Sequence, residues 1–181
     1  MSGVAEKYKF VLTGRWIPEK SEAGQAYTSF KYWVTSDLGL GFDYRPLVDK
    51  VSLTATYRLV SEDSKGWMPA VILGTSVDDF TDGSDSVESR AYFFTVSKAL
   101  RDARFFGITP APYAGAVWIQ ELEELRPLAG VGFRHQEASL ILQYSGTDTH
   151  LTLSRSINEN ISVSAIYWGM KYPGIGMRVR F

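Results

Sequence analysis

The chain is defined first by what it lacks. Its 181 residues include no cysteine, which excludes disulfide bonds and thiolate metal sites. No hydrophobic run approaches the length of about 18 residues that a transmembrane helix needs. The formal net charge is −1, so no global field favours nucleic acid as a partner. The start, MSGVAEKYKF, has no apolar signal-peptide segment, so we expect that export is not needed or that a signal was removed.

Signals for catalysis and metal binding are also scarce. The chain has two histidines, His135 and His150, and neither lies in a GxSxG or HExxH motif. Ser139 and Ser154 fall near His150, a combination that membrane-barrel hydrolases use. The favoured interpretation is that His150 is a structural residue inside a barrel. Threonine or water would then satisfy its ring nitrogens. We therefore predict no catalytic residues, no cofactor and no enzyme activity.

The most acidic segment, DDFTDGSD at 78–85, has carboxylates that would suit Ca²⁺. Its spacing does not match the EF-hand pattern, because Phe80 stands where a ligand is required. We predict a solvated acidic loop and no metal site.

What the chain does have is alternation of apolar and polar residues along nearly its whole length, with turn residues between the segments. This pattern predicts an all-β, single up-and-down antiparallel barrel of about twelve strands, forming one domain over residues 1–181 because no linker divides it. One short helix is expected over Val117–Leu125. The expected strands are 7–16, 27–35, 38–46, 51–60, 67–75, 89–98, 102–110, 126–134, 137–145, 148–156, 161–169 and 174–181.

The expected connections are unequal at the two ends of the barrel. Three connections that follow odd-numbered strands are long: 17–26, 76–88 and 111–125. Those that follow even-numbered strands are short. Long loops at one end and tight turns at the other are typical of outer-membrane barrels.

The number of strands indicates which face meets which medium. About eight strands leave an interior that side chains can fill, whereas about twelve leave a lumen too wide for a dry core. The polar face of each strand should then line a wet lumen and the apolar face should meet lipid. Aromatic residues on the apolar face, such as Trp16, Tyr44 and Tyr144, lie near strand ends, where a membrane–water boundary would place them. We therefore expect a transmembrane β-barrel rather than a soluble barrel or sandwich.

Lumen-facing positions are rich in one sign of charge. A basic wall in low-dielectric surroundings favours anions and hinders cations, as in a porin-like channel. Asp43 is the only acid with the same predicted orientation. Trp33, Phe93 and Trp168 share it as well, so the lumen is either open or plugged. The predicted basic residues of the lumen are Lys9, Arg15, Lys31, Arg45, Arg58, Arg134, Arg178 and Arg180.

The final segment, GIGMRVRF, alternates apolar residues with arginine and ends on an aromatic residue. We expect Val179 and Phe181 to face lipid on the strand that closes the barrel, so that no edge remains unpaired. This segment resembles the C-terminal signal by which bacterial outer-membrane proteins are handed to their insertion machinery.

A longer resemblance follows from FDYRPLVDKVSLTATYRL, MPAVILGTSVDDF, RAYFFTVSKAL and the later hairpins SLILQYSGTDTHLTLSRSINENISVSAIYWG. These segments resemble the YjbH-like family of outer-membrane proteins, which is associated with exopolysaccharide secretion. The positions that carry the resemblance are Pro69, Ala70, Leu73, Gly74, Tyr92, Ser97 and Lys98.

With the basic lumen, these features predict a barrel in the bacterial outer membrane that passes or helps to export anionic material, and the resemblance implies polysaccharide as that material. Its expected partners are outer-membrane lipid, the insertion machinery and proteins of an export complex. One alternative is a non-conducting structural barrel that docks a partner protein through its long loops, for example through PAPYAGAVWIQELEEL. A barrel-borne hydrolase is the third hypothesis.

Overall fold

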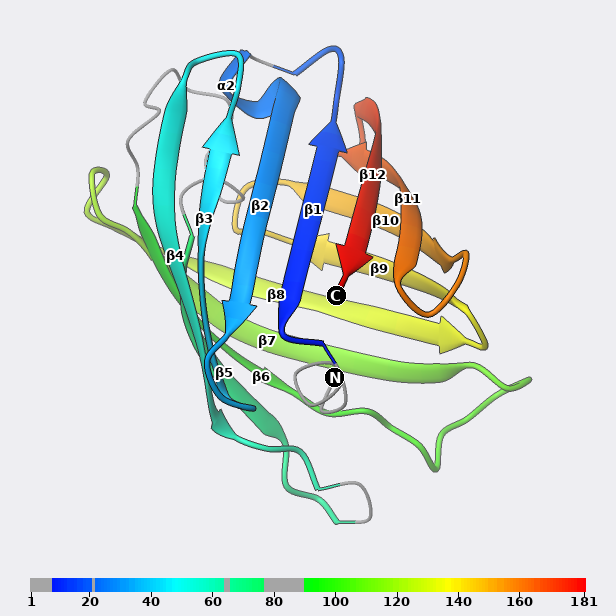
Figure 1. Cartoon of the computed structure of the whole chain (residues 1–181). Coiled ribbons are helices and arrows are strands. Elements are labelled where there is room, and N and C mark those ends of the chain that lie inside the picture. Colours follow the sequence, from blue (N-terminus) through cyan, green and yellow to red (C-terminus); the bar gives the residue numbers. More distant parts are fainter. Residues whose placement is uncertain (1–7, 21, 64–65, 77–89) are drawn as a thin grey trace.

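The structure, a computed structural model, describes residues 8–20, 22–63, 66–76 and 90–181. It is a closed barrel in which each strand pairs antiparallel with the next and β12 pairs with β1 (Figure 1). One helical turn, α2 (Glu22–Gln25), lies between β1 and β2. The predicted all-β barrel of twelve strands is confirmed. The strands are β1 (Phe10–Trp16), β2 (Ala26–Trp33), β3 (Leu38–Arg45), β4 (Lys50–Val60), β5 (Ala70–Ser76), β6 (Ala91–Ser97), β7 (Thr109–Ile119), β8 (Glu124–His135), β9 (Ala138–Tyr144), β10 (Thr149–Ser156), β11 (Ile161–Trp168) and β12 (Tyr172–Arg180).

The region around β7 differs from the prediction. The strand expected over 102–110 and the helix expected over Val117–Leu125 are both wrong, because β7 begins at Thr109 and a turn at 120–123 leads into β8. Pro110 and Pro112 lie within β7, although proline lacks the N–H that a ladder needs. In the structure their carbonyls accept bonds from the backbone N–H groups of Leu100 and Lys98, beyond the end of β6. The missing N–H groups therefore weaken no bond between β7 and β8.

The connections lie at two ends, which we call the odd end and the even end after the strands that they follow. The odd end has long connections at 17–25 and 77–90, and the even end has long connections at 61–69 and 98–108. The predicted asymmetry is therefore corrected: the even end also carries long connections, because 98–108 is not a strand. β1 begins and β12 ends at the even end (Figure 1).

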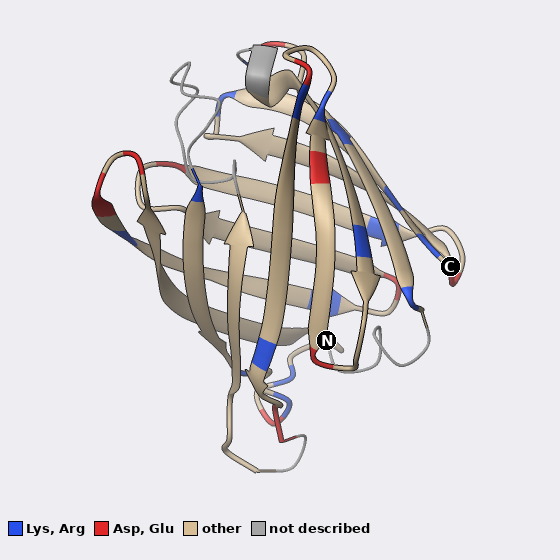
Figure 2. Cartoon of the chain, turned by 60° about the vertical axis from the view of Figure 1, so that its left-hand side comes forward, with Lys and Arg blue, Asp and Glu red and all other residues tan. Residues whose placement is uncertain are grey.

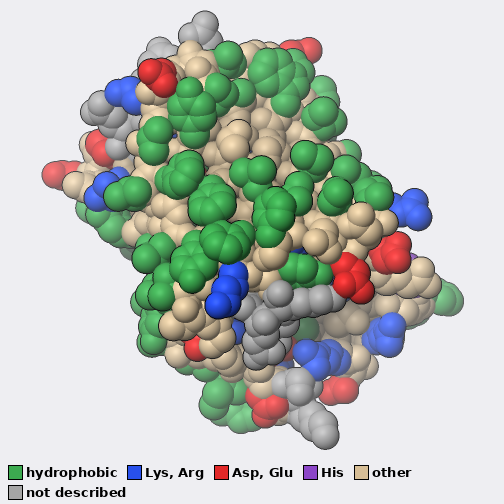
Figure 3. All heavy atoms as spheres, in the orientation of Figure 1, with side chains coloured by type: hydrophobic (Ala, Val, Ile, Leu, Met, Phe, Trp, Pro, Cys, Tyr) green, Lys and Arg blue, Asp and Glu red, His purple; other side chains and the backbone are tan. Residues whose placement is uncertain are grey.

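The outer wall of the barrel is apolar. The paired registers place Leu40, Phe42, Leu53 and Leu73 on this wall, and each is exposed. Figure 3 shows hydrophobic side chains spread over the wall formed by β1–β4, with charged side chains mainly around its margins. Within the twelve strands, Arg155 is the only Lys, Arg, Asp or Glu whose alternation places it on the outer wall. This distribution reverses that of a soluble protein.

Six Tyr and Trp side chains of the outer wall lie at the odd end. Each belongs to a different strand and lies within the first or last two residues of that strand, so together they form a ring around this end. The side chains of Tyr and Trp have an apolar body and a polar atom that can bond water. The members are Trp16, Tyr44, Tyr92, Trp118, Tyr144 and Tyr167.

Candidate functional site in the barrel interior

Five of the predicted lumen residues share one inner wall. Arg15, Lys31, Arg45, Arg178 and Arg180 come from β1, β2, β3 and β12, which are neighbours in the barrel. The register places Lys31, Val11 and Arg180 in one row across β2, β1 and β12. Arg45 is 3% exposed. Basic side chains therefore concentrate on one side of the interior, and Figure 2 shows Lys and Arg as bands on the strands while most Asp and Glu lie in connections.

The other three predicted residues lie at the even end. Arg58 makes an ion pair with Asp37 of the β2–β3 turn, with 3.4 Å between Nη1 and Oδ1. Arg134 is exposed near the end of β8, and Lys9 is exposed just before β1. These side chains belong to the rim of the barrel and not to the basic inner wall.

Two charged residues of the interior, Arg126 and Lys20, are not among the predicted ones. Arg126 lies on the inner face of β8 and forms an ion pair of 2.7 Å with Glu124, an inward-pointing acid exposed at the odd end of that strand. Lys20 is 8% exposed and comes from the connection 17–25. Extending the alternation of β8 backwards from Leu128 would have found Arg126 and Glu124, and it shows that Asp43 is not the only inward acid. Nothing local in the sequence indicates that Lys20 enters the barrel.

The connection 17–25 folds into the odd end of the lumen. Ile17 is completely buried, and its backbone N–H donates to Gln25 O at 2.8 Å. A Cβ at Gly174 would lie only 2.6 Å from Ile17 Cγ1, so a glycine is needed for this close approach. Lys20 then reaches the indole of Trp168, with Nζ 3.9 Å from the ring centroid.

Trp168 organises a cluster of cations and rings in the interior. The guanidinium carbon of Arg15 lies 4.7 Å from the centroid of Trp168 and 4.8 Å from that of Tyr27. The imidazole of His150 stacks on Trp168 with centroids 4.0 Å apart. Such cation–π contacts each contribute about 0.5–2 kcal/mol, depending on burial. The cluster narrows the odd end of the lumen and attaches the connection 17–25 to β11.

His150 is held by groups other than those expected. Its Nδ1 accepts the backbone N–H of Gly169 at 2.9 Å, so in the neutral ring Nε2 carries the proton. Nε2 then donates to Ser145 Oγ at 3.1 Å. Ser154 instead pairs with Ser164 at 2.8 Å. In this tautomer the imidazole has no free nitrogen to take a proton from Ser145.

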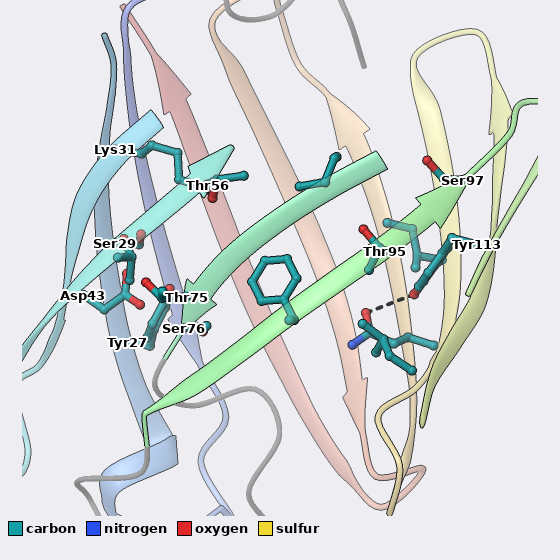
Figure 4. A pocket seen from close by; sticks show the side chains of 16 residues that line it. Tyr27, Ser29, Lys31, Asp43, Thr56, Thr75, Ser76, Thr95, Ser97 and Tyr113 are labelled. Atoms are coloured by element: carbon teal, nitrogen blue, oxygen red, sulfur yellow. Dashed lines mark hydrogen bonds between the residues drawn. The ribbon is translucent and has the colours of Figure 1, made fainter. Parts of the chain in front are cut away.

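A cavity of about 390 Å³ occupies the interior (Figure 4). Its wall is rich in hydroxyl groups and also holds Lys31, Asp43 and Phe93. Lys31 Nζ donates to Thr56 Oγ1 at 3.0 Å, and Tyr113 OH donates to Gln143 Oε1 at 3.1 Å. The hydroxyl-bearing residues of the wall are Tyr27, Ser29, Thr54, Thr56, Thr75, Ser76, Thr95, Ser97 and Tyr113.

Part of the inner wall is apolar. Ala91, Val117, Ile119 and Leu128 form a buried cluster on β6, β7 and β8, and Phe93 and Tyr113 pack against it. On the opposite wall Trp33 Nε1 and Arg180 Nε are buried and have no hydrogen-bond partner within the described residues. Buried polar atoms are normally satisfied by protein or water. The interior therefore combines an apolar cluster on β6, β7 and β8 with polar and basic positions that suit water or a polar solute.

Within the described residues, no group of three or more His, Asp or Glu could hold a metal ion. The acidic segment 78–85 lies outside the described residues. A search of the described helices for one long and apolar enough to cross a membrane found none.

Comparison with protein-family models gave no match, and comparison with curated proteins gave none either.

Proposed function

We propose that this protein is a bacterial outer-membrane barrel whose basic lumen passes or helps to export anionic material. The observation that carries the proposal is the reversed distribution of polarity. The outer wall exposes large apolar side chains, for example Leu53 at 71%, Ile175 at 66% and Val51 at 63%. Charged side chains such as Asp43 and Arg45 are buried inside. Apolar area in water is unfavourable by about 25 cal/mol per Å², whereas the same wall is stable in lipid.

The ends of the wall support the same placement. The aromatic ring at the odd end suits the boundary between lipid and water. Arg155 lies one residue from the even end of β10, where a long cationic side chain can extend to the water. Val179 pairs with Leu12 and Ile161, and the backbone N–H of Phe181 donates to Phe10 O at 3.0 Å. Phe181 therefore continues the seam between β12 and β1, the place expected for an assembly signal that insertion machinery reads.

The interior supports anions as the cargo. Five basic side chains on one inner wall, with Lys20 added from the connection 17–25, give that wall a positive potential that low-dielectric surroundings strengthen. The hydroxyl-rich cavity supplies donors and acceptors for a polar chain. Polysaccharide is the substrate class that the resemblance to YjbH-like proteins implies, and we retain that family and an export-complex partner as part of the proposal.

A second candidate is a non-conducting barrel that docks a partner protein. The specific observation in its favour is the connection 17–25, which enters the lumen and is held there by Trp168.

Conductance in a planar bilayer tests the first proposal against the second. We expect anion-selective current, and Arg178→Glu together with Arg180→Glu should shift the reversal potential towards cation selectivity. A matched pair of single changes isolates the lumen: Arg178→Glu should shift the potential, whereas Arg155→Glu on the outer wall should not. A folded barrel that passes no current would refute the pore and leave the second candidate.

A further inference from the structure

The even end carries a hairpin turn in which a phenylalanine adopts a strained backbone conformation and is also exposed. Within the connection 98–108, Phe105 and Ile108 exchange backbone hydrogen bonds of 3.1 and 2.8 Å around Phe106 and Gly107. Both central residues have positive φ, +48° at Phe106 and +78° at Gly107. Such turns normally use Asn-Gly or Asp-Gly, because a bulky residue at positive φ is strained. A phenylalanine in this position is therefore not explained by the turn itself.

The same phenylalanine is also exposed. Phe106 is 82% exposed and Phe105 69% exposed, and their rings meet edge to face with centroids 4.3 Å apart. Neither side chain belongs to the core of the described residues. Backbone strain and exposed aromatic area at one position point to a role outside the fold.

The turn is ordered and anchored to the barrel. A Cβ at Gly107 would lie 3.1 Å from the ring of His135 at the end of β8, so the turn packs closely on that strand. At the base of the connection, Lys98 Nζ donates to Asp63 O at 2.6 Å and to Met68 O at 3.2 Å. These bonds join it to the neighbouring connection 61–69, which presents Trp67 at 85% exposure. The backbone that carries the two rings is therefore anchored to the barrel.

Two features of the turn favour lipid as its partner. Ile108 alternates with Pro110 and Pro112, so the face of the turn that carries Phe105 continues the apolar outer wall of β7. Arg101 and Arg104 are exposed on the same connection, which also bears one acid, Asp102. Aromatic rings beside arginine match the boundary where acyl chains meet lipid phosphates.

We propose that the Phe105–Phe106 turn is an interfacial anchor that inserts both rings between the headgroups and acyl chains beside the even end, with Arg101 and Arg104 against lipid phosphate. The anchor rests on the proposed membrane function. It adds to that function a fixed depth of the barrel in the membrane at the even end, where Tyr32 is the outer-wall Tyr or Trp within two residues of a strand end, compared with six such residues at the odd end.

The absence of cysteine makes a site-specific test direct. Single variants Phe106→Cys, Gln136→Cys and Leu53→Cys are labelled with an environment-sensitive fluorophore and folded into vesicles of phosphatidylethanolamine and phosphatidylglycerol. Gln136 is the matched control, because it is exposed, has a φ of +49° and lies in the β8–β9 turn at the same end. Leu53 reports on the outer wall itself.

We expect a lipid-borne quencher to quench the label at Phe106 several-fold more than the label at Gln136, with the reverse order for aqueous iodide. Equal iodide quenching at both turns, with the Leu53 label quenched by lipid, would overturn the anchor and leave the membrane barrel standing; the turn would then meet water or protein. Iodide quenching at Leu53 as well would overturn the membrane placement.

A label outside the two rings measures the depth of the turn in the membrane with the rings present and with the rings removed. A label on Ala103→Cys, which is exposed on the same connection, should be quenched by lipid in the otherwise natural chain. Adding Phe105→Ser and Phe106→Asn should reduce that quenching at least about twofold, because asparagine accepts positive φ but does not insert. No reduction would overturn the role of the rings.

Discussion

The two faces of β6 allow the same substitution to be placed in opposite surroundings. Phe94 is the central residue of this strand, is 45% exposed and lies on the outer wall between Leu73 and Ala116. Thr95, the next residue, lines the interior cavity of about 390 Å³. The pair Phe94→Arg and Thr95→Arg therefore differs in face but hardly in position along the strand.

The expected magnitudes differ clearly. An arginine on the lipid face near the bilayer midplane costs about 2–4 kcal/mol, so Phe94→Arg should lower the free energy of unfolding in vesicles by at least that amount. This corresponds to about 30- to 1,000-fold in the folding equilibrium. Thr95→Arg places its side chain in a polar cavity, although Lys31 repels it, so we expect a loss of about 1 kcal/mol or less.

Reversible urea unfolding in vesicles, followed by tryptophan fluorescence, measures both changes. If Thr95→Arg is the more destabilising, the inward and outward faces have been exchanged. If Phe94→Arg changes the free energy of unfolding by no more than about 0.5 kcal/mol, as surface substitutions in soluble proteins do, the outer wall meets water and the membrane placement fails. A conservative Phe94→Leu variant separates the loss of the ring from the added charge.

Three further outcomes are expected. Lys20→Ala removes the contact with Trp168 and should raise single-channel conductance by freeing the connection 17–25, whereas Lys171→Ala, in an exposed turn at the same end, should not. His150→Phe keeps a ring against Trp168 but loses the bonds to Gly169 and Ser145, so the free energy of unfolding should fall by about 1–3 kcal/mol; an unchanged value would show that these bonds contribute nothing. Phe181→Ala should slow machinery-assisted insertion into vesicles while the urea midpoint stays nearly constant; a shifted midpoint with normal insertion would contradict a role in assembly.

Eleven of the twelve strands, and the two faces of each, could be predicted from the sequence. Alternation with period two is a local property, so Leu38, Leu40, Phe42 and Tyr44 could be assigned to one wall before any pairing was known. The same reasoning placed Arg178 and Arg180 on the opposite face from Val179. Turn residues between the segments then limited the number of strands, and the closed barrel agrees with that count.

The misplaced strand at 102–110 and the wrong helix at Val117–Leu125 arose where local signals conflict with long-range pairing. Pro110 and Pro112 argue against a strand, yet they are accommodated because β7 extends past the end of β6 and needs no N–H there. That extension is visible only once the lengths of neighbouring strands are known. The turn at Phe106 escaped notice for a similar reason, since its residues are not the usual ones for positive φ.

Which basic residues lie together inside the barrel depends on the closure of the whole sheet and could not be predicted from the sequence. Closure brings β12 next to β1 and so gathers Arg15, Arg178 and Arg180 on one wall. Lys20 reaches Trp168, 148 residues away in the sequence, because the connection 17–25 folds inward over Gly174. Alternation states which way a side chain points within its strand, whereas its neighbours across the lumen depend on the curvature and closure of the whole sheet.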